Sequence, residues 1–415
     1  MNAGKKCLVS GRSMFMTSAP AVFAALLLWQ MFTACTPSGK IPASAKSDFE
    51  LMAEAWNTIE AHYVDRTAVQ PTAMTYGAIN GMVDALGDID HSTFLTPEEI
   101  KREEEFTKGH YKGIGIEIKM KDGHVTIVAP LDNSPAQKAG VRAGEIILAV
   151  DGKNVAGLSL LQVVKLVSGP VGTNVRLLLL DPQTSLTREA TLTRADITAE
   201  NVTWIRLPGT RIDHLRISAF SEKVTQSLII ALKAIEREKS QGIVLDLRNN
   251  PGGVLDDAVS TASQFLQGGN VLLEKDAKGQ LRDIPVEKGG AARHIPMVCL
   301  VNGGTASASE IVAGALKDHQ RARLVGTKTF GTGTVLQKFP LSDGSALLLA
   351  IREWLTPDGE TIWHKGITPD LVVPLPAGVS PLTPLEERGM TAQQLQQSKD
   401  RQLLDAMGLL TGRAE

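Results

Sequence analysis

The chain of 415 residues is long enough for two or three domains, and its hydrophobic content of 43% is sufficient for packed cores. Its formal net charge of −2 excludes a general electrostatic attraction to nucleic acid or to anionic membranes. The 38 glycines and 20 prolines are spread along the chain, which favours a globular α/β protein with many turns.

The N-terminus has the pattern of a targeting signal. Lys5, Lys6 and Arg12 precede a long apolar stretch that ends in small residues just before Cys35. This pattern resembles a bacterial lipoprotein signal, in which Cys35 becomes the lipidated residue, although Phe32 stands where a smaller aliphatic residue is usual. A plain signal peptide and an uncleaved anchor helix are the alternatives. All three place the rest of the chain outside the cytoplasm. With the preferred lipid anchor we expect it in the cell envelope, membrane-anchored and facing the periplasm or the cell exterior.

Cysteine usage agrees with this interpretation. Cys7 lies within the signal and Cys35 at its end, so only Cys299 remains, in the apolar run "IPMVCLV" of a predicted core strand. One thiol can form neither an internal disulfide nor a Cys-based zinc site, and the eight histidines show no metal-binding pattern. We therefore predict no metal and no cofactor.

The segment after the signal predicts a tether followed by helices. Residues 36–47 are rich in Pro, Ser, Gly and Lys, which is typical of a linker. In residues 48–107 apolar side chains recur at helical spacing, as in "DFELMAEAWNTIEAHYV" and in "MTYGAINGMVDALG", which ends at Gly87. A further helix begins in "DHSTFLTPEEI", with Thr96 as its N-cap and Pro97 in the first turn.

Short strands and Asp-Gly turns replace the helices from residue 109 onward. "YKGIGIEIKMKDGHVTIVAP" contains a hairpin turn at Asp122–Gly123. "NSPAQKAGVRAGEIILAVDGKNV" predicts a short helix, a strand and a second Asp-Gly turn, and the amphipathic helix "LSLLQVVKLVSG" and the strand "NVRLLLLD" follow. These elements predict a small, β-rich domain.

A second α/β unit starts near residue 202. Strands are predicted at "HLRISAF", "GIVLDLR", "IPMVCLVN" and "RARLVG", and helices at "KVTQSLIIALKAIEREK", "GVLDDAVSTASQFL" and "SEIVAGALKDH". Their alternation implies a largely parallel sheet. "VLQKFPLSDGSALLLAIREWLTPDGETIW" predicts a meander of hairpins, and one polar helix, "TAQQLQQSKDRQLLDAMGLL", is predicted near the end of the chain.

Ser307 stands just before an apolar helical pattern. At a helix N-terminus its hydroxyl would be exposed, and the amide of Ala308 would point outward with the positive end of the helix dipole. That geometry suits a nucleophile with one oxyanion donor in place. Ser307 and Glu310 also have capping-box spacing, and on this motif alone an ordinary cap is the preferred interpretation.

Gly252 and Gly253 follow the predicted strand "GIVLDLR". Two glycines at the carboxyl end of a strand let backbone amides approach a ligand closely, although most such loops are only tight strand-to-helix turns. Combined with Ser307, they offer a candidate second oxyanion donor.

The combination of "GIGIEI" with "SPAQKAGVRAGEIILAVDGKNV" resembles a PDZ domain covering roughly residues 110–195. Such a domain adds a peptide strand to an open sheet edge and holds the terminal carboxylate in a backbone nest. The residues that match the carboxylate loop are Gly113, Ile114, Gly115 and Ile116. The alternative is a domain that only packs against its neighbour.

Over about residues 48–375 the chain resembles the carboxyl-terminal processing peptidases, which are serine endopeptidases of the bacterial envelope and of chloroplasts. The motifs that match are "LGDIDHSTFLTPEE", the PDZ segment, "LDLRNNPGG", "SASEIVAGALKDHQRARLVG", "TFGTGTVL" and "TPDGETIWHKGITPDLVV". The resemblance implies a crotonase-like α/β peptidase core with an inserted PDZ domain and an N-terminal helical region. It also implies protein or peptide substrates with free C-termini, a PDZ domain that gates the active site, and helices through which members can form homo-oligomers.

Active members of that family use a Ser/Lys dyad, and the resemblance assigns Ser307 as the nucleophile and Ala308, Gly252 and Gly253 as oxyanion amides. Five segments are expected from these patterns: a signal peptide at 1–35, a tether and N-terminal helical region at 36–108, a PDZ domain at 109–196, an α/β serine-peptidase core at 197–376 and a C-terminal helical tail at 377–415.

The sequence departs from the family at the base. Thr332 stands at the position of the dyad lysine, and Leu336 at that of the glutamine that positions it. A lysine acts as a base once burial lowers its pKa, whereas a threonine hydroxyl titrates far above neutral pH. Lys328 is the nearest alternative base, but it reaches Ser307 only if the glycines fold the loop back, and its position also suits an exposed loop residue. The chain is therefore either a peptidase with an altered base or a catalytically impaired relative that acts as a PDZ-containing peptide-binding or scaffold lipoprotein.

Overall fold

The structure is a computed structural model that describes residues 40–87, 92–107, 110–121, 123–158, 160–182, 184–198, 200–376 and 379–412. The predicted signal, Cys35 and the first part of the tether lie outside the described residues. Contacts divide the chain into a unit that ends at His62 and a second unit that begins at Tyr63. The first unit contains the short η1 (Ala43–Ala45) and the predicted helix α1 (Lys46–His62). Within the described residues, no helix has the length and apolarity needed to span a bilayer.

The second unit begins with α2 (Pro71–Asp84) and α3 (Pro97–Thr107), which the sequence predicted, but a strand lies between them. This strand, β1 (Thr93–Leu95), was missed within a segment interpreted as helical throughout. It forms because it pairs antiparallel with β18 and because Phe94, 2% exposed, packs beside the Tyr76 ring. Three residues are too few to show a period of two.

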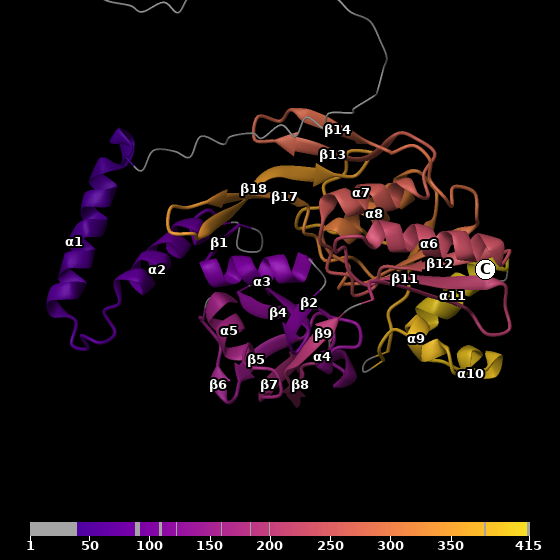
Figure 1. Cartoon of the computed structure of the whole chain (residues 1–415), viewed down its shortest axis with the longest axis horizontal. Coiled ribbons are helices and arrows are strands. Elements are labelled where there is room, and N and C mark those ends of the chain that lie inside the picture. Colours follow the sequence, from indigo (N-terminus) through magenta and orange to yellow (C-terminus); the bar gives the residue numbers. More distant parts are fainter. Residues whose placement is uncertain are drawn as a thin grey trace, which may run out of the picture. The chain divides into compact units, whose positions relative to one another are not determined.

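The β-rich domain has the sheet order β3-β4-β5-β7-β8, with β6 beside β5, and Figure 1 labels β4 to β8 close together. Its strands are β3 (Ile116–Lys121), β4 (His124–Pro130), β5 (Ile146–Val150), β6 (Lys153–Asn154), β7 (Asn174–Asp181) and β8 (Leu186–Thr193), and β2 (His110–Gly113) pairs with β9 (Ala195–Thr198). The helices are α4 (Pro135–Lys138) and α5 (Leu160–Val167), which packs against β3 and β5. In this sheet β3 is an edge strand.

The α/β unit contains a six-stranded sheet in the order β10-β11-β12-β15-β16-β19, parallel except for β10. Its strands are β10 (Val202–Arg206), β11 (Ile212–Ile217), β12 (Gly242–Asp246), β15 (Met297–Val301), β16 (Arg323–Gly326) and β19 (Leu371–Val372). The predicted strand-and-helix alternation is thereby confirmed. Successive residues of β12 enter different cores, since Ile243 and Leu245 belong to one buried cluster and Val244 to another.

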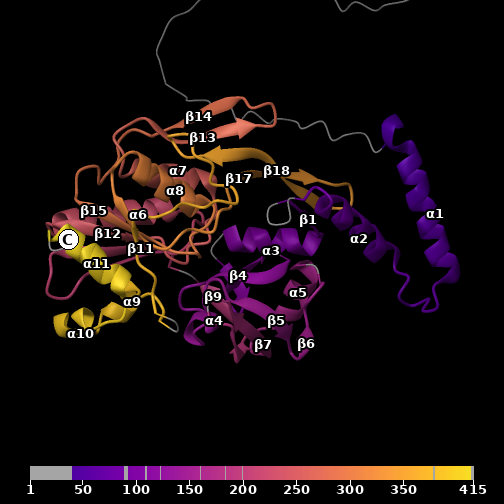
Figure 2. The ribbon, with the colours of Figure 1, turned by 180° about the vertical axis from the view of Figure 1, so that it is seen from behind.

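Helices cover both faces of this sheet (Figures 1 and 2). One face packs on α6 (Val224–Arg237), α7 (Leu255–Ser263) and α8 (Ala308–Asp318), and the other on α10 (Ala392–Gln396) and α11 (Arg401–Leu410). Cys299 is fully buried in the first core, as predicted, and burial raises the pKa of its thiol. The segment "TAQQLQQSKDRQLLDAMGLL" was predicted as one helix but forms α10 and α11, because Asp400 caps α11 by accepting from the Leu403 amide at 3.1 Å.

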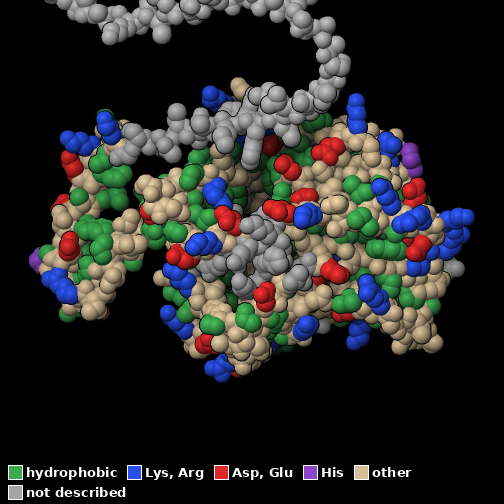
Figure 3. Space-filling model, viewed as in Figure 1, with side chains coloured by type: hydrophobic (Ala, Val, Ile, Leu, Met, Phe, Trp, Pro, Cys, Tyr) green, Lys and Arg blue, Asp and Glu red, His purple; other side chains and the backbone are tan. Residues whose placement is uncertain are grey.

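A second sheet of the same unit has the order β1-β18-β13-β14, with β17 paired to β18. The predicted hairpin is present as β17 (Thr334–Pro340) and β18 (Ala346–Leu355). The hairpin β13 (Asn270–Asp276) and β14 (Leu281–Pro285) was not predicted. Acidic and basic side chains both occur across the face shown in Figure 3, which agrees with the small net charge.

His214 joins the central sheet to α9 (Pro384–Glu387) in the C-terminal tail. Its Nδ1 lies 2.9 Å from Glu387 Oε1 and its Nε2 3.1 Å from Asp246 Oδ2, and all three side chains are fully buried. Burial by itself lowers the pKa of His214, but the Glu387 and Asp246 carboxylates outweigh burial and raise the pKa to about 9. The imidazolium is therefore the stable form at neutral pH.

We expect the docked tail to lose stability in alkaline solution. Because the folded pKa of His214 is raised, its contribution is complete below the unfolded value near 6.5 and disappears as the pH rises through about 9. The loss is on the order of 3 kcal/mol at most. The temperature at the midpoint of thermal unfolding should decrease as the pH rises from 7 to 10. Glu387→Gln should make this decrease smaller. The exposed Glu236→Gln is the control, and equal slopes for both variants would contradict the assignment.

Candidate active site

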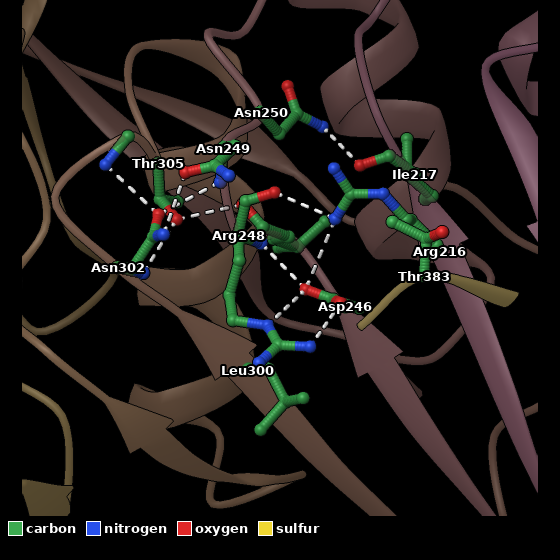
Figure 4. Close-up of polar contacts among 12 residues, drawn as sticks. Arg216, Ile217, Asp246, Arg248, Asn249, Asn250, Leu300, Asn302, Thr305 and Thr383 are labelled. Carbon is green, nitrogen blue, oxygen red and sulfur yellow. Dashed lines mark hydrogen bonds and ion pairs between the residues drawn. The ribbon is translucent and has the colours of Figure 1, made fainter. Parts of the chain in front are cut away.

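Two loops at the carboxyl ends of β12 and β15 are joined side by side (Figure 4). The Asn249 amide donates to Asn302 Oδ1 at 2.8 Å, and Asn302 Nδ2 donates to Asn249 Oδ1 at 2.8 Å. Thr305 Oγ1 donates to the Leu247 carbonyl at 2.8 Å. Since adjacent parallel strands end at the same edge of the sheet, these bonds bring the glycine loop and the Ser307 loop into contact.

Gly252 lies directly against the candidate nucleophile. A Cβ atom at Gly252 would stand 2.7 Å from Ser307 Cβ and 2.8 Å from the Ala308 nitrogen, and its φ is +98°. The loop is fixed there because the Asn250 carbonyl accepts from the Ala306 amide at 2.9 Å and from Ser309 Oγ at 2.7 Å. Only glycine permits this approach.

Ser307 has a backbone that ordinary N-caps do not have. Its φ is 56° and its ψ −123°, a region that costs a non-glycine residue on the order of 1–3 kcal/mol. The predicted capping box with Glu310 is present, and the Ser307 amide donates to Glu310 Oε2 at 3.0 Å. The Glu310 amide donates to the Ser307 carbonyl at 2.8 Å, so the helix does not depend on the hydroxyl for that donor. Ser307 is half-buried at the start of α8.

Backbone donors surround this position. The amide of Ala308 occupies the first turn of α8 and, like that of Gly253, has no acceptor among the described residues. The Gly252 amide differs, since it donates to Asn250 Oδ1 at 2.9 Å. Gly252 therefore shapes the loop, and Gly253, which is exposed, carries the available amide. Two free donors beside a serine suit an oxyanion site.

Glu310 is a buried organising residue that sequence reasoning saw only as a capping partner. Its carboxylate accepts from the amides of Thr332 at 2.9 Å and Gly331 at 2.8 Å, and from Thr329 Oγ1 at 2.5 Å. Burial raises its pKa, and these hydrogen bonds oppose the increase. Because Oε2 binds the amides of both Ser307 and Thr332, one carboxylate oxygen places the "TFGTG" loop against the serine. The sequence signal for this role is an acidic residue within an otherwise apolar helical pattern.

Thr332 lies buried in a tightly held loop. A Cβ atom at Gly333 would stand 2.1 Å from the Trp363 nitrogen, so the loop lies flat on the segment that follows β18. Thr332 is 3% exposed, and Lys119 Nζ lies 3.5 Å from its Oγ1. Lys119 belongs to β3 of the other domain, and no sequence argument had selected it. Leu336 is 36% exposed on β17.

Residues 211–373 match the model of peptidase family S41, and residues 126–181 match a PDZ domain. The chain is 40% identical over 306 residues to a carboxy-terminal-processing protease of Bartonella bacilliformis, covering 72% of this chain and 70% of that protein. A carboxy-terminal processing protease of Bacillus subtilis is 33% identical over 343 residues, with 81% and 71% covered.

The chain belongs to peptidase family S41. A solved photosystem II D1 C-terminal processing protease is similar in fold, with a TM-score of 0.67 and 32% identity over 80% of this chain and 95% of that one. The resemblance drawn from the motifs is confirmed, as are the S41 core, the PDZ domain and the serine-type carboxy-terminal processing class.

In this S41 peptidase, Gly113–Ile116 connect β2 to β3 of the PDZ domain. Ile114 is 2% exposed, and its carbonyl accepts from the Ala136 amide at 3.0 Å. A Cβ atom at Gly115, where φ is +73°, would stand 2.3 Å from Ser134 Cβ. The loop thus packs on the start of α4 at one end of the edge strand β3, where a carboxylate loop is expected.

The PDZ domain is joined to the S41 core next to Arg248, which precedes the glycine loop. Arg216 of β11 is 2% exposed and donates through Nη2 to Asp132 Oδ1 of the PDZ domain and through Nη1 to the Arg248 carbonyl, both at 2.8 Å. A cleft of about 410 Å³ lies between the domains, lined by residues that include Arg142, Asn302, Lys328 and Phe330. Lys328 is exposed there, as the sequence suggested for a loop residue. No cluster of metal ligands occurs within the described residues.

Proposed function

We propose that this S41 peptidase is an active serine endopeptidase in which Ser307 is the nucleophile. The observation that carries the proposal is the strained backbone of Ser307, with φ 56° and ψ −123°, beside the free amides of Ala308 and Gly253. Backbone strain persists only where the surrounding structure imposes it, and here Gly252 and Glu310 do so. An ordinary helix cap needs none of these devices.

The arrangement suits acyl transfer. Ser307 Oγ would attack the carbonyl carbon of a peptide bond, and its proton would pass to a base. The amides of Ala308 and Gly253 would donate hydrogen bonds to the oxyanion, a contribution worth about 10²–10³ in rate per donor in other hydrolases. The leaving amine would take the proton, and water would then hydrolyse the acyl-enzyme.

We propose proteins or peptides with free C-termini as substrates. The edge strand β3 and the helix α5 that packs beside it leave one edge of the PDZ sheet open to an added strand, within the described residues. The loop Gly113–Ile116 would receive the terminal carboxylate at the end of that edge. Binding there would present the substrate chain to the S41 core.

We also propose that the chain is exported and anchored at a membrane of the cell envelope, facing the periplasm or the cell exterior. The charged and apolar N-terminal pattern before Cys35 supports this, with a lipid as the preferred anchor. Exposed apolar side chains along α1, namely Phe49, Leu51, Met52 and Ile59, support association into homo-oligomers.

A fluorophosphonate probe tests the nucleophile. Wild-type protein should be labelled and should cleave labelled β-casein, an unstructured protein, whereas Ser307→Ala should do neither while unfolding at the same temperature. Ser227→Ala, which alters an exposed serine of α6 far from the candidate site, is the control and should keep both labelling and cleavage. Equal labelling and cleavage by wild type and Ser307→Ala would refute the proposal and favour a peptide-binding role.

A further inference from the structure

The two faces of β3 are directed at different parts of the molecule. Ile116, Ile118 and Met120 pack against the core of the PDZ domain. Because side chains alternate along a strand, the side chains between them point the other way. Lys119 Nζ lies 5.5 Å from the centre of the Phe330 ring, and Lys121 Nζ lies 4.8 Å from it. The lysine face of β3 therefore lies against the loop of the S41 core that precedes Thr332.

Of these two lysines, Lys119 is the one that contacts the side chain at the family's base position. Its Nζ is 3.5 Å from Thr332 Oγ1, within hydrogen-bond reach of the side chain that stands where the dyad lysine is expected. Lys119 is half-buried, whereas Lys121 is exposed. Lys328, the alternative considered from the sequence, is exposed on the interdomain cleft. An amine thus occupies the neighbourhood of position 332, although it comes from a residue 213 positions away in the chain.

We propose that Lys119 of the PDZ domain supplies the base that the peptidase core lacks. The proposal rests on the proposed function, since it requires Ser307 to be a nucleophile. Lys119 Nζ, which donates to Thr332 Oγ1 in the structure, first releases a proton to solvent. The amine then accepts a proton by way of the Thr332 hydroxyl, which gives its own proton to Nζ as it takes the proton of Ser307 Oγ. A hydroxyl can do both because it donates one hydrogen bond and accepts others. The Ser307 oxygen then bonds to the substrate carbonyl carbon, and the proton returns along the same path to the leaving amine.

The surroundings of Lys119 fit this role. The charged or titratable groups that face the same region are Glu117 and Lys121 on β3 and Glu310 on α8. Glu310 is occupied by donors from the Ser307 and Thr332 backbone, and it does not form an ion pair with Lys119 within the described residues. Burial raises the pKa of Glu117, and the positive charge of Lys119 opposes that increase.

One consequence concerns the substrate. The strand that carries Lys119 is also the strand whose open edge would receive the peptide. Peptide binding and proton transfer would then depend on the position of one and the same strand, so a misplaced PDZ domain would remove the base together with the substrate.

The test compares Lys119→Met with Lys121→Met in the full-length chain, each alone and in the background Thr332→Lys, Leu336→Gln. Casein hydrolysis is measured from pH 6 to 10. Lys119→Met should lower kcat by about 10²-fold or more, the range of general-base contributions, with KM within about threefold and with loss of the rise in kcat at alkaline pH. Lys121→Met, the matched control from the same strand, should stay within about threefold of wild type in kcat.

Two further variants separate a chemical role from a structural one. In the Thr332→Lys, Leu336→Gln background, which restores the family dyad, Lys119→Met should change kcat less than about threefold. Thr332→Val should lose activity like Lys119→Met, and Thr332→Ser should keep it. An unchanged kcat and pH profile in Lys119→Met, or an equal loss in the restored background, would overturn the proposal. A wild type no more active than Ser307→Ala would instead refute the proposed function, and the assignment of Lys119 with it.

Discussion

Replacing Asp246 by asparagine is expected to lower the free energy of unfolding by about 3–5 kcal/mol, the cost of leaving buried charges without their partner. Asp246 Oδ1 accepts from the Arg248 backbone amide at 2.8 Å, and Oδ2 accepts from Arg248 Nη2 at 2.8 Å and faces His214 at 3.1 Å. Burial alone would raise the pKa of Asp246, but the guanidinium groups of Arg248 and Arg216 hold it well below its usual range. An asparagine would turn an NH₂ group toward these donors.

Urea unfolding at pH 7 measures this effect. Asp283→Asn makes the same chemical change at an exposed position of β14 and should stay within about 0.5 kcal/mol of wild type. Because the folded pKa of Asp246 is depressed, the difference between the two variants should persist down to acidic pH and vanish only as the carboxylate is protonated. A loss below about 1 kcal/mol for Asp246→Asn would show that the buried charges are compensated by other groups.

Replacing Gly252 by alanine is expected to reduce kcat by about 10²-fold or more, because it displaces Ser307 and the oxyanion amides together. The added methyl group would meet three atoms of the nucleophile loop at 2.7–2.8 Å, the Ala306 oxygen, Ser307 Cβ and the Ala308 nitrogen. All three belong to segments fixed by hydrogen bonds, so the loop must move instead of the methyl group. The φ of +98° adds strain for any residue with a Cβ.

Casein hydrolysis and fluorophosphonate labelling of Gly252→Ala are the measurements. Gly279→Ala is the control for backbone strain, since Gly279 also has a positive φ, +77°, but no atom within 4 Å of the added Cβ. It should leave kcat unchanged. A Gly252→Ala enzyme with at least half of the wild-type kcat would mean that the Ser307 loop tolerates a displacement of this size and that the close contact has no catalytic purpose.

The parallel sheet and the PDZ sheet were predictable because their information is local. Alternating apolar strands and helices, Asp-Gly turns and the glycines after β12 each lie within a few residues of the structure they specify. The strand β1 was not predictable in this way, since it exists only through pairing with β18, some 250 residues away in the chain, as Phe94↔Leu347 shows. The hairpin β13–β14 was overlooked although its turn, Asp276–Gly279, has Asp at the first position and Gly at the fourth, as type I turns favour.

The candidate site divides along the same line. Ser307, Ala308 and the glycine loop were found because each belongs to a short motif with its own backbone consequence. Lys119 could not be found, because nothing near it in the sequence refers to Thr332 and its relevance arises only when two domains pack together. Glu310 lies between these cases. Its spacing from Ser307 was noticed, but its bonds to the Thr332 loop depend on tertiary contact.

The hydrogen bond that the Thr332 amide donates to Glu310 bears on which side chains position 332 can carry. The loop is held through backbone atoms, by Glu310 on one side and by the segment around Trp363 on the other, so its path does not depend on what position 332 carries. A lysine can therefore be removed there without collapse of the loop, and proton transfer requires only that another amine reaches the vacated space. The base can therefore act at the same place in the site although a residue of another domain supplies it. The domain that selects the substrate can in this way also hold the group that makes cleavage possible.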